Sequence, residues 1–154
     1  MIASGSGTET WATLGDKNNA NGPASIALGT NAGTSQGNSA IAIGYGTAYS
    51  GQSANAIALG FAAGYGNQQA NAIAIGTASG YATQGINAVA IGVSAGLTNQ
   101  ANNSIIINAT GNALEQTRVN TFTVAPVRND VANIGEVVFY NTTSKEITYG
   151  NTIS

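Results

Sequence analysis

A six-residue segment that ends in glycine recurs along the chain and limits its fold more than any other feature. NAIALG at residues 55–60 returns as NAIAIG at 71–76 and as NAVAIG at 87–92. The last position of the segment falls at Gly15, Gly29, Gly44, Gly60, Gly76, Gly92 and Asn108. The intervals between these positions are 14, 15, 16, 16, 16 and 16 residues, whereas helical-hairpin repeats need about 34 residues and propeller blades about 40. Two short strands and two turns fit this length, so the repeat predicts an all-β, parallel β-solenoid of about seven rungs.

The apolar residues within each segment alternate with a period of two, which is typical of a β-strand. Ile41 and Ile43 fall on one side of such a strand, and Ala42 falls on the other. β-Branched residues at i and i+2, followed by glycine, favour a strand over a helix with its period of 3.6 residues. Because of their size, we expect the large aliphatic side chains to face inward and to stack, rung on rung, into a thin core.

The opposite side of this strand carries an unbroken column of alanines. Its members are Ala27, Ala42, Ala58, Ala74 and Ala90. A strand with one face in water normally alternates apolar with polar residues, so both faces of this strand are expected to be buried. A coil of this length encloses few side chains, and association is a usual remedy for a small core. The sequence therefore predicts that the chain forms a homo-oligomer with the alanine column as its interface.

Three columns of polar or aromatic residues follow from the same spacing. They are Tyr49, Tyr65 and Tyr81; Gln52, Gln68, Gln84 and Gln100; and Asn55, Asn71, Asn87 and Asn103. Stacked amides can hydrogen-bond along a solenoid, so the glutamine and asparagine columns are expected to stabilise its turns. The tyrosine column is expected to be a structural ladder of packed rings. The alternative is an exposed surface-binding ladder on which sugar rings stack.

The middle of the chain carries no charge. No Asp, Glu, Lys, Arg or His lies between Lys17 and Glu115, and the net charge of the chain is −2. So few cations cannot form a basic surface that would bind phosphate backbones or anionic membranes. Nucleic acid is therefore not an expected partner. No stretch reaches the roughly 18 apolar residues of a membrane span, so no membrane insertion is expected.

The repeat region lacks the groups that catalysis requires. General acid and base chemistry needs paired ionisable side chains, and this region contains none. The chain has no cysteine and no histidine. The glycine-rich segment GYGTAYSG at 44–51 lacks the third glycine of a dinucleotide-binding turn. We therefore expect no enzymatic activity, no cofactor and no metal site.

The pattern changes after residue 114, where the repeat ends and charges and proline return. The segment up to Val124 is expected to be a strand that ends before Pro126. Two more strands are expected at 136–140 and 146–149, around a polar turn. A small sheet here would cap the open end of the solenoid. The predicted organisation is an N-terminal segment at 1–9, the repeat domain at 10–114 and a C-terminal β-hairpin cap at 115–154.

The repeats NSAIAIG, NAIALG, NAIAIG and NAVAIG resemble the head repeats of YadA-like trimeric adhesins. The order AGLTNQANNSIIINATGNAL, then FTVAPVRND, then FYNTTSKEITYG resembles the fibre proteins of phages and large DNA viruses more closely. The resemblance covers residues 10 to 149. It implies a left-handed β-roll wound as a homotrimer, with the chains either intertwined or packed side by side.

The function implied by this resemblance is structural. We expect a stiff trimeric spacer in an external virion fibre, which contacts other virion proteins and a host cell-surface glycan or protein. The alternative is the head of a bacterial trimeric autotransporter adhesin, which would place the chain on a bacterial cell surface. A self-assembling extracellular filament ranks lower. An ice-binding solenoid also ranks lower, because it would need a flat array of threonines and the threonines of this chain do not share a column.

Overall fold

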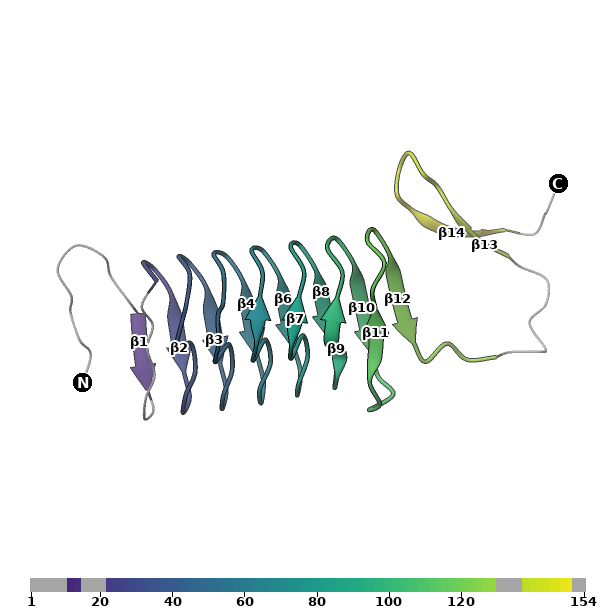
Figure 1. Cartoon of the computed structure of the whole chain (residues 1–154). Helices are drawn as coiled ribbons and strands as arrows, with labels where there is room; N and C mark the ends of the chain where they lie inside the picture. Colours follow the sequence, from purple (N-terminus) through teal and green to yellow (C-terminus); the bar gives the residue numbers. More distant parts are fainter. Residues whose placement is uncertain (1–10, 15–21, 130–136, 151–154) are drawn as a thin grey trace.

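The chain forms a parallel β-solenoid of about six turns, followed by a small antiparallel hairpin (Figure 1). The computed structural model describes residues 11–14, 22–129 and 137–150. The predicted fold class is therefore confirmed, with about six turns in place of the predicted seven rungs. The left-handed winding and the homotrimeric packing stay predictions, and the predicted N-terminal segment at 1–9 lies outside the described residues.

Two parallel sheets form the walls of the solenoid. The first has the strand order β1-β2-β3-β4-β6-β8-β10-β12, and the second has the order β11-β9-β7-β5. The strands of the first sheet are β1 (Trp11–Leu14), β2 (Ile26–Leu28), β3 (Ile41–Ile43), β4 (Ile57–Leu59), β6 (Ile73–Ile75), β8 (Val89–Ile91), β10 (Ile105–Asn108) and β12 (Phe122–Ala125). Those of the second sheet are β5 (Asn67–Gln68), β7 (Thr83–Gln84), β9 (Ala95–Gln100) and β11 (Leu114–Gln116).

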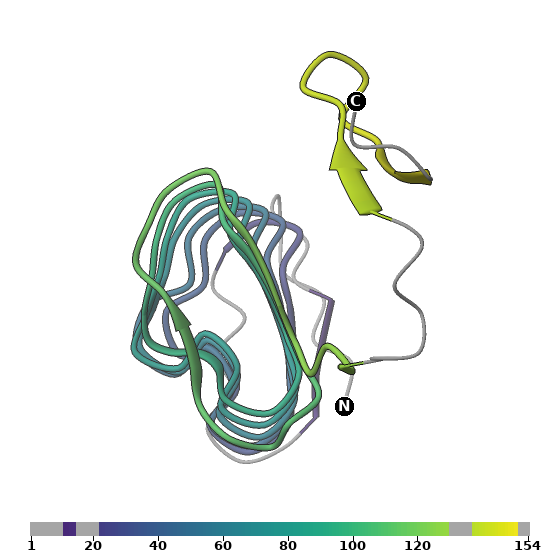
Figure 2. The ribbon, with the colours of Figure 1, turned by 90° about the vertical axis from the view of Figure 1, so that its right-hand side faces the viewer.

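Equivalent residues of successive repeats lie directly beside each other. Ile41 of β3 pairs with Ile57 of β4, and Ala42 pairs with Ala58. The same register continues from β4 to β6 and from β6 to β8. Seen nearly end-on, the coils superimpose (Figure 2). The repeat thus sets the register, because a slip of one residue would exchange the inner and outer faces of a strand.

The turns depend on left-handed backbone at fixed positions of the repeat. In the coil around Gly60, residues Asn55, Ala62 and Gly64 have φ angles of 59°, 53° and 56°. Gly60 itself has a φ of 130°, a value that residues with a Cβ rarely adopt. A Cβ atom at Gly60 would also lie 2.8 Å from the carbonyl oxygen of Gly76 in the next coil. Glycine at this position therefore permits both the turn and the close approach of neighbouring coils.

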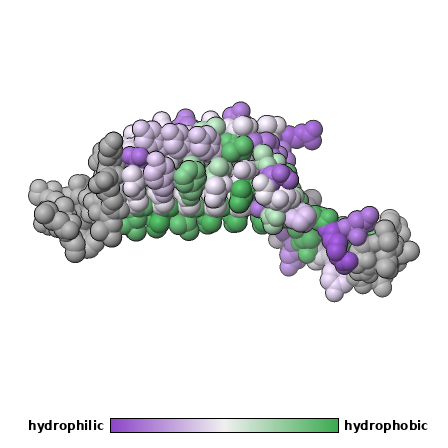
Figure 3. All heavy atoms as spheres, turned by 90° about the horizontal axis from the view of Figure 1, so that it is seen from below, coloured by the Kyte–Doolittle hydropathy of each residue, from purple (hydrophilic) through white to green (hydrophobic). Residues whose placement is uncertain are grey.

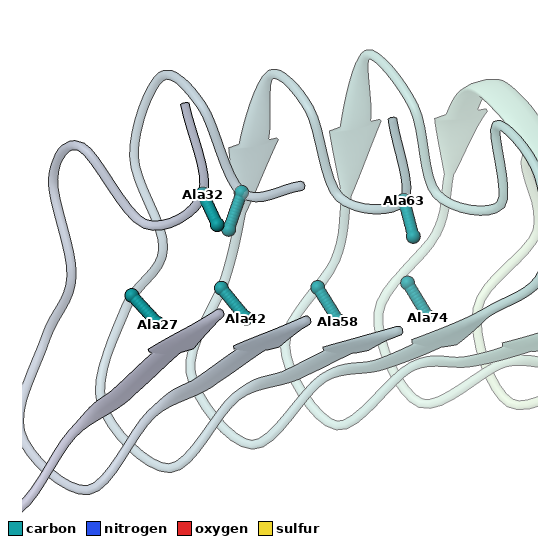
Figure 4. Packing of buried hydrophobic residues seen from close by; sticks show 7 residues of the cluster. Ala27, Ala32, Ala42, Ala58, Ala63 and Ala74 are labelled. Carbon is teal, nitrogen blue, oxygen red and sulfur yellow. The ribbon is translucent and has the colours of Figure 1, made fainter. Parts of the chain in front are cut away.

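The inner and outer faces of the first sheet are the reverse of those predicted. The interface alanines Ala27, Ala42, Ala58, Ala74 and Ala90 all have 0% exposed surface within the single chain. In Figure 4, four of them point across the interior toward Ala32 and Ala63, which come from the opposite side of the coil. A column with no accessible surface cannot contact another copy, so the prediction that these alanines form the oligomer interface is wrong.

The physical reason is the small width of the interior. The two walls approach closely enough that alanine meets alanine across the coil, and glutamine side chains fill part of the remaining space, since Gln68 and Gln84 are fully buried. An isoleucine pair pointing inward would not fit beside these amides. Only near the end of the solenoid does Ile106 take the inner position, where it packs against Leu114.

The solenoid continues beyond the predicted boundary at residue 114. Strand β11 pairs with β9, and β12 pairs with β10 in the register Ile105 to Phe122. The strand predicted before Pro126 is present, but it belongs to the first sheet of the solenoid and not to a cap. The predicted hairpin is formed by β13 (Val137–Tyr140) and β14 (Ile147–Gly150), which pair with each other as a separate sheet.

Candidate functional site

The outer face of the first sheet carries two parallel columns of large apolar side chains, which we name the apolar stripe. One column contains Ile26, Ile41, Ile57, Ile73, Val89, Ile105 and Phe122. The other contains Leu28, Ile43, Leu59, Ile75, Ile91, Ile107 and Val124. No polar residue interrupts either column. At the strand spacing of about 4.8 Å, the stripe extends for roughly 29 Å.

The apolar stripe is accessible along its length. Exposure reaches 42% at Leu59 and 54% at Phe122, and the other members are half-buried or exposed. Figure 3 shows a row of hydrophobic residues along one edge of the roll. Contiguous apolar surface of this kind marks an interaction site more often than an ordinary solvated face. The stripe, and not the alanine column, is therefore the accessible apolar surface of the first sheet.

The glutamine column forms the predicted hydrogen-bonded ladder, and it lies inside the roll. The Nε2 group of Gln52 donates to Oε1 of Gln68 at 3.0 Å, and Gln68 donates in the same way to Gln84 at 3.0 Å. Gln36 begins the ladder and Gln100 ends it. Each amide also donates to a strand carbonyl, as Gln68 does to Ile57 at 2.8 Å. The ladder therefore joins each turn to the first sheet and to the next coil.

The asparagine column forms a second ladder on an exposed corner. Asn55 donates to Asn71, Asn71 to Asn87 and Asn87 to Asn103, at 3.2, 3.0 and 3.0 Å. The four residues have φ angles between 54° and 59°, a conformation that asparagine tolerates better than most residues. This column confirms the predicted role of the amides in stabilising the turns.

The tyrosine column is a stack of nearly parallel rings. The ring centroids of Tyr49 and Tyr65 are 5.1 Å apart, and those of Tyr65 and Tyr81 are 4.9 Å apart. Tyr45 and Phe61 form a second stack at 5.6 Å. A sugar ring stacks on the face of an aromatic ring, and here each ring covers the face of its neighbour. The geometry favours the structural ladder over the sugar platform.

Replacing Tyr65 with leucine is expected to lower the free energy of unfolding by about 1–3 kcal/mol, because two stacked contacts of roughly 0.5–1.5 kcal/mol each are lost. Leucine fits the column, since Leu97 stands one coil beyond Tyr81. The matched control is Tyr45→Leu, which removes a single stack. Urea unfolding followed by circular dichroism, at one protein concentration, measures both. Equal losses for the two variants would show that the stacked geometry contributes little.

The described residues show no arrangement suited to metal chemistry. Among them, no three His, Cys, Asp or Glu side chains lie close enough together to hold a metal ion. The same part of the chain contains no helix with the length and hydropathy of a membrane span. The predicted lack of enzymatic activity, cofactor and metal stays a prediction.

Comparison with known proteins identifies no relative of this chain: no family model matches it, and neither does any curated protein or solved structure. Its function is therefore inferred from the fold and the surfaces described above, together with the sequence resemblance.

Proposed function

We propose that the chain is a segment of a homotrimeric fibre on the outside of a virion, where it acts as a stiff spacer. The observation that carries this proposal is the apolar stripe, which runs uninterrupted from β2 to β12. Three copies that turn this face toward a common axis would each bury their stripe. The repeats and the C-terminal FTVAPVRND and FYNTTSKEITYG segments resemble trimeric fibre proteins and support the same assembly.

The rest of the roll suits a spacer. Parallel strands connect the successive coils, and two amide ladders add hydrogen bonds between the coils from Gln36 to Asn103, so bending the roll would break many hydrogen bonds together. Of the described residues, 22–114 carry no charged side chain, so stacked or neighbouring coils experience no charge repulsion. The accessible outer surfaces then remain for contact with other virion proteins and with a host cell-surface glycan or protein.

The head of a bacterial trimeric adhesin is the alternative, since its repeats would explain the same roll and stripe. The C-terminal segments favour the viral fibre, because they are part of the resemblance to fibre proteins only. An ice-binding solenoid would need a flat array of threonines. On the outer side of the second sheet Asn67, Thr83 and Asn99 share one column, so that array is not formed there.

The test is the native mass by light scattering, compared between the natural chain and Ile73→Lys. The natural chain is expected at three times its mass of 15.3 kDa. Ile73 lies at the middle of the apolar stripe, so the variant is expected to be largely monomeric, because its lysines would meet around the axis without a counter-charge.

The control is Asn99→Lys, which places the same charge on the exposed outer side of the second sheet and is expected to keep the trimeric mass. Circular dichroism shows whether each variant keeps its strands. A natural chain that is monomeric at micromolar concentration would overturn the proposed trimer.

A further inference from the structure

The C-terminal hairpin presents a second apolar face that no other described part of the chain covers. Val138 pairs with Tyr149 and Tyr140 pairs with Ile147, and paired residues of an antiparallel ladder lie on the same side. These four side chains, which we name the hairpin face, are 70%, 73%, 59% and 59% exposed in that order. Phe139 and Thr148 lie on the other side, where Phe139 is 40% exposed.

The turn of the hairpin is well defined by local contacts. Asn141 Oδ1 accepts hydrogen bonds from the backbone N–H groups of Thr143 and Ser144, at 2.8 and 3.0 Å. Lys145 adopts a φ of 65° and donates its N–H to the Asn141 carbonyl at 2.9 Å. These bonds fix the register, but an isolated two-stranded hairpin in water is marginally stable at best. A partner that buries the hairpin face is required for it to persist.

The composition of the hairpin face favours another copy of the same hairpin as that partner. Around a symmetry axis identical residues meet, so a charged group there would face its own copies. The hairpin face has no charged residue, and the charges of the hairpin, Lys145 and Glu146, lie beside the turn.

The area of the hairpin face suits a contact that adds to a larger interface. An aromatic side chain buries about 150–250 Å², so the four side chains expose on the order of 400 Å² per copy. Three copies would bury on the order of 1,200 Å² in total, or about 400 Å² for each pair of copies, which is below a standard two-partner interface and suits a contact that adds to the apolar stripe. Exposed apolar residues also continue along the chain beyond the stripe, since Phe122 and Val124 are its last members and Val127 after them is 76% exposed.

We propose that the hairpins of neighbouring copies pack together through the hairpin face and form a second contact, separate from the apolar stripe. This inference rests on the proposed trimer. Its consequence is that the hairpins join the copies at the C-terminal end of the assembly, while the apolar stripes join them along the roll.

Disulfide cross-linking tests the proposal, because the chain has no natural cysteine. Val138→Cys places a thiol on the hairpin face, and the matched control Thr148→Cys places one on the opposite side. After mild oxidation, a denaturing gel without reductant is expected to show covalent dimer for Val138→Cys at a level at least fivefold above that for Thr148→Cys. Hydrogen exchange of the amides of 137–150 in the natural chain is expected to show protection.

The outcomes separate this inference from the proposed function. A trimeric mass with selective cross-linking and protected hairpin amides supports both. A trimeric mass with equal cross-linking of the two variants and unprotected amides overturns the hairpin contact and leaves the trimer standing. Selective cross-linking of a chain whose roll does not form a trimer supports the hairpin contact and overturns the proposed trimer. A monomer without selective cross-linking overturns both.

Discussion

Replacing Gly60 with alanine is expected to destabilise the roll severely, whereas the same change at Gly46 is expected to be tolerated. The new Cβ atom at Gly60 would lie 2.8 Å from a backbone oxygen of the next coil, at a φ of 130°. Backbone strain of about 1–3 kcal/mol adds to an overpacking loss of similar size. The expected loss of about 2–6 kcal/mol is a large part of the stability of a domain of this size.

Gly46 is the matched control because it also has positive φ but has space around it. Its φ is 62°, and a Cβ atom there would come no closer than 3.7 Å, to the ring of Tyr65. The next two coils have Ala62 and Ala78 at this position, with φ of 53° and 52°. Gly46→Ala is expected to change the free energy of unfolding by about 1 kcal/mol or less. Urea midpoints at equal protein concentration measure both variants, and similar midpoints would contradict the close approach of the coils.

Replacing Gln68 with glutamate is the second change with a large expected effect. The new carboxylate would be buried and could keep the hydrogen bond from Gln52, but it would have no donor for the Ile57 carbonyl and the amide oxygen of Gln84, which now accept from Gln68. An uncompensated buried charge of this kind costs about 3–5 kcal/mol. The matched control is Gln69→Glu, one residue further along and partly exposed, which is expected to change stability by less than about 1 kcal/mol.

The effect of Gln68→Glu is expected to depend on pH with a defined sign. Burial among acceptors raises the pKa of the new carboxyl above its unfolded value of about 4.3. Below that pH the group is neutral in both states and can donate one hydrogen bond, so the loss is smallest. The loss grows as the pH rises through the interval between the unfolded and the folded pKa. Thermal unfolding at pH 4 and pH 7 measures it, and a deficit that is larger at pH 4 would contradict the buried ladder.

Much of the fold follows from the sequence because the repeat determines both register and turn positions. The spacing of Gly44, Gly60 and Gly76 predicts the parallel stack, and the amide columns predict the hydrogen bonds that the structure contains. These predictions succeed because identical residues at a fixed spacing must stack in any regular solenoid. No assumption about side-chain size enters them.

The prediction of which face of the first sheet points inward is wrong, because it was inferred from side-chain size. Large aliphatic residues usually lie inside, but here the interior is too narrow for them. A usable signal is present in the repeat itself. The alanine column does not vary from Ala27 to Ala90, whereas the positions on either side of each alanine vary among Ile, Leu and Val. A position that tolerates only alanine is sterically restricted, and one that accepts several shapes has space.

The end of the roll was misplaced because β11 and β12 no longer carry the repeat. LEQ and FTVA share no landmark glycine with the earlier coils, yet their backbones pair with β9 and β10. Backbone pairing needs only an extended segment of the right length beside an open edge. The period of the repeat therefore does not show where backbone pairing ends.

Because the coils stack in register, the length of the roll is set by the number of repeat units. Each coil contacts only the coils before and after it, through the same strand pairs and the same glutamine and asparagine bonds. Adding or removing one complete 16-residue unit therefore recreates an identical junction and changes the height by one strand spacing, about 4.8 Å. An insertion of half a unit would instead place glutamine against a non-matching side chain. Duplication or deletion of whole repeat units can thus change the length of the roll in discrete steps while the contacts between coils stay the same.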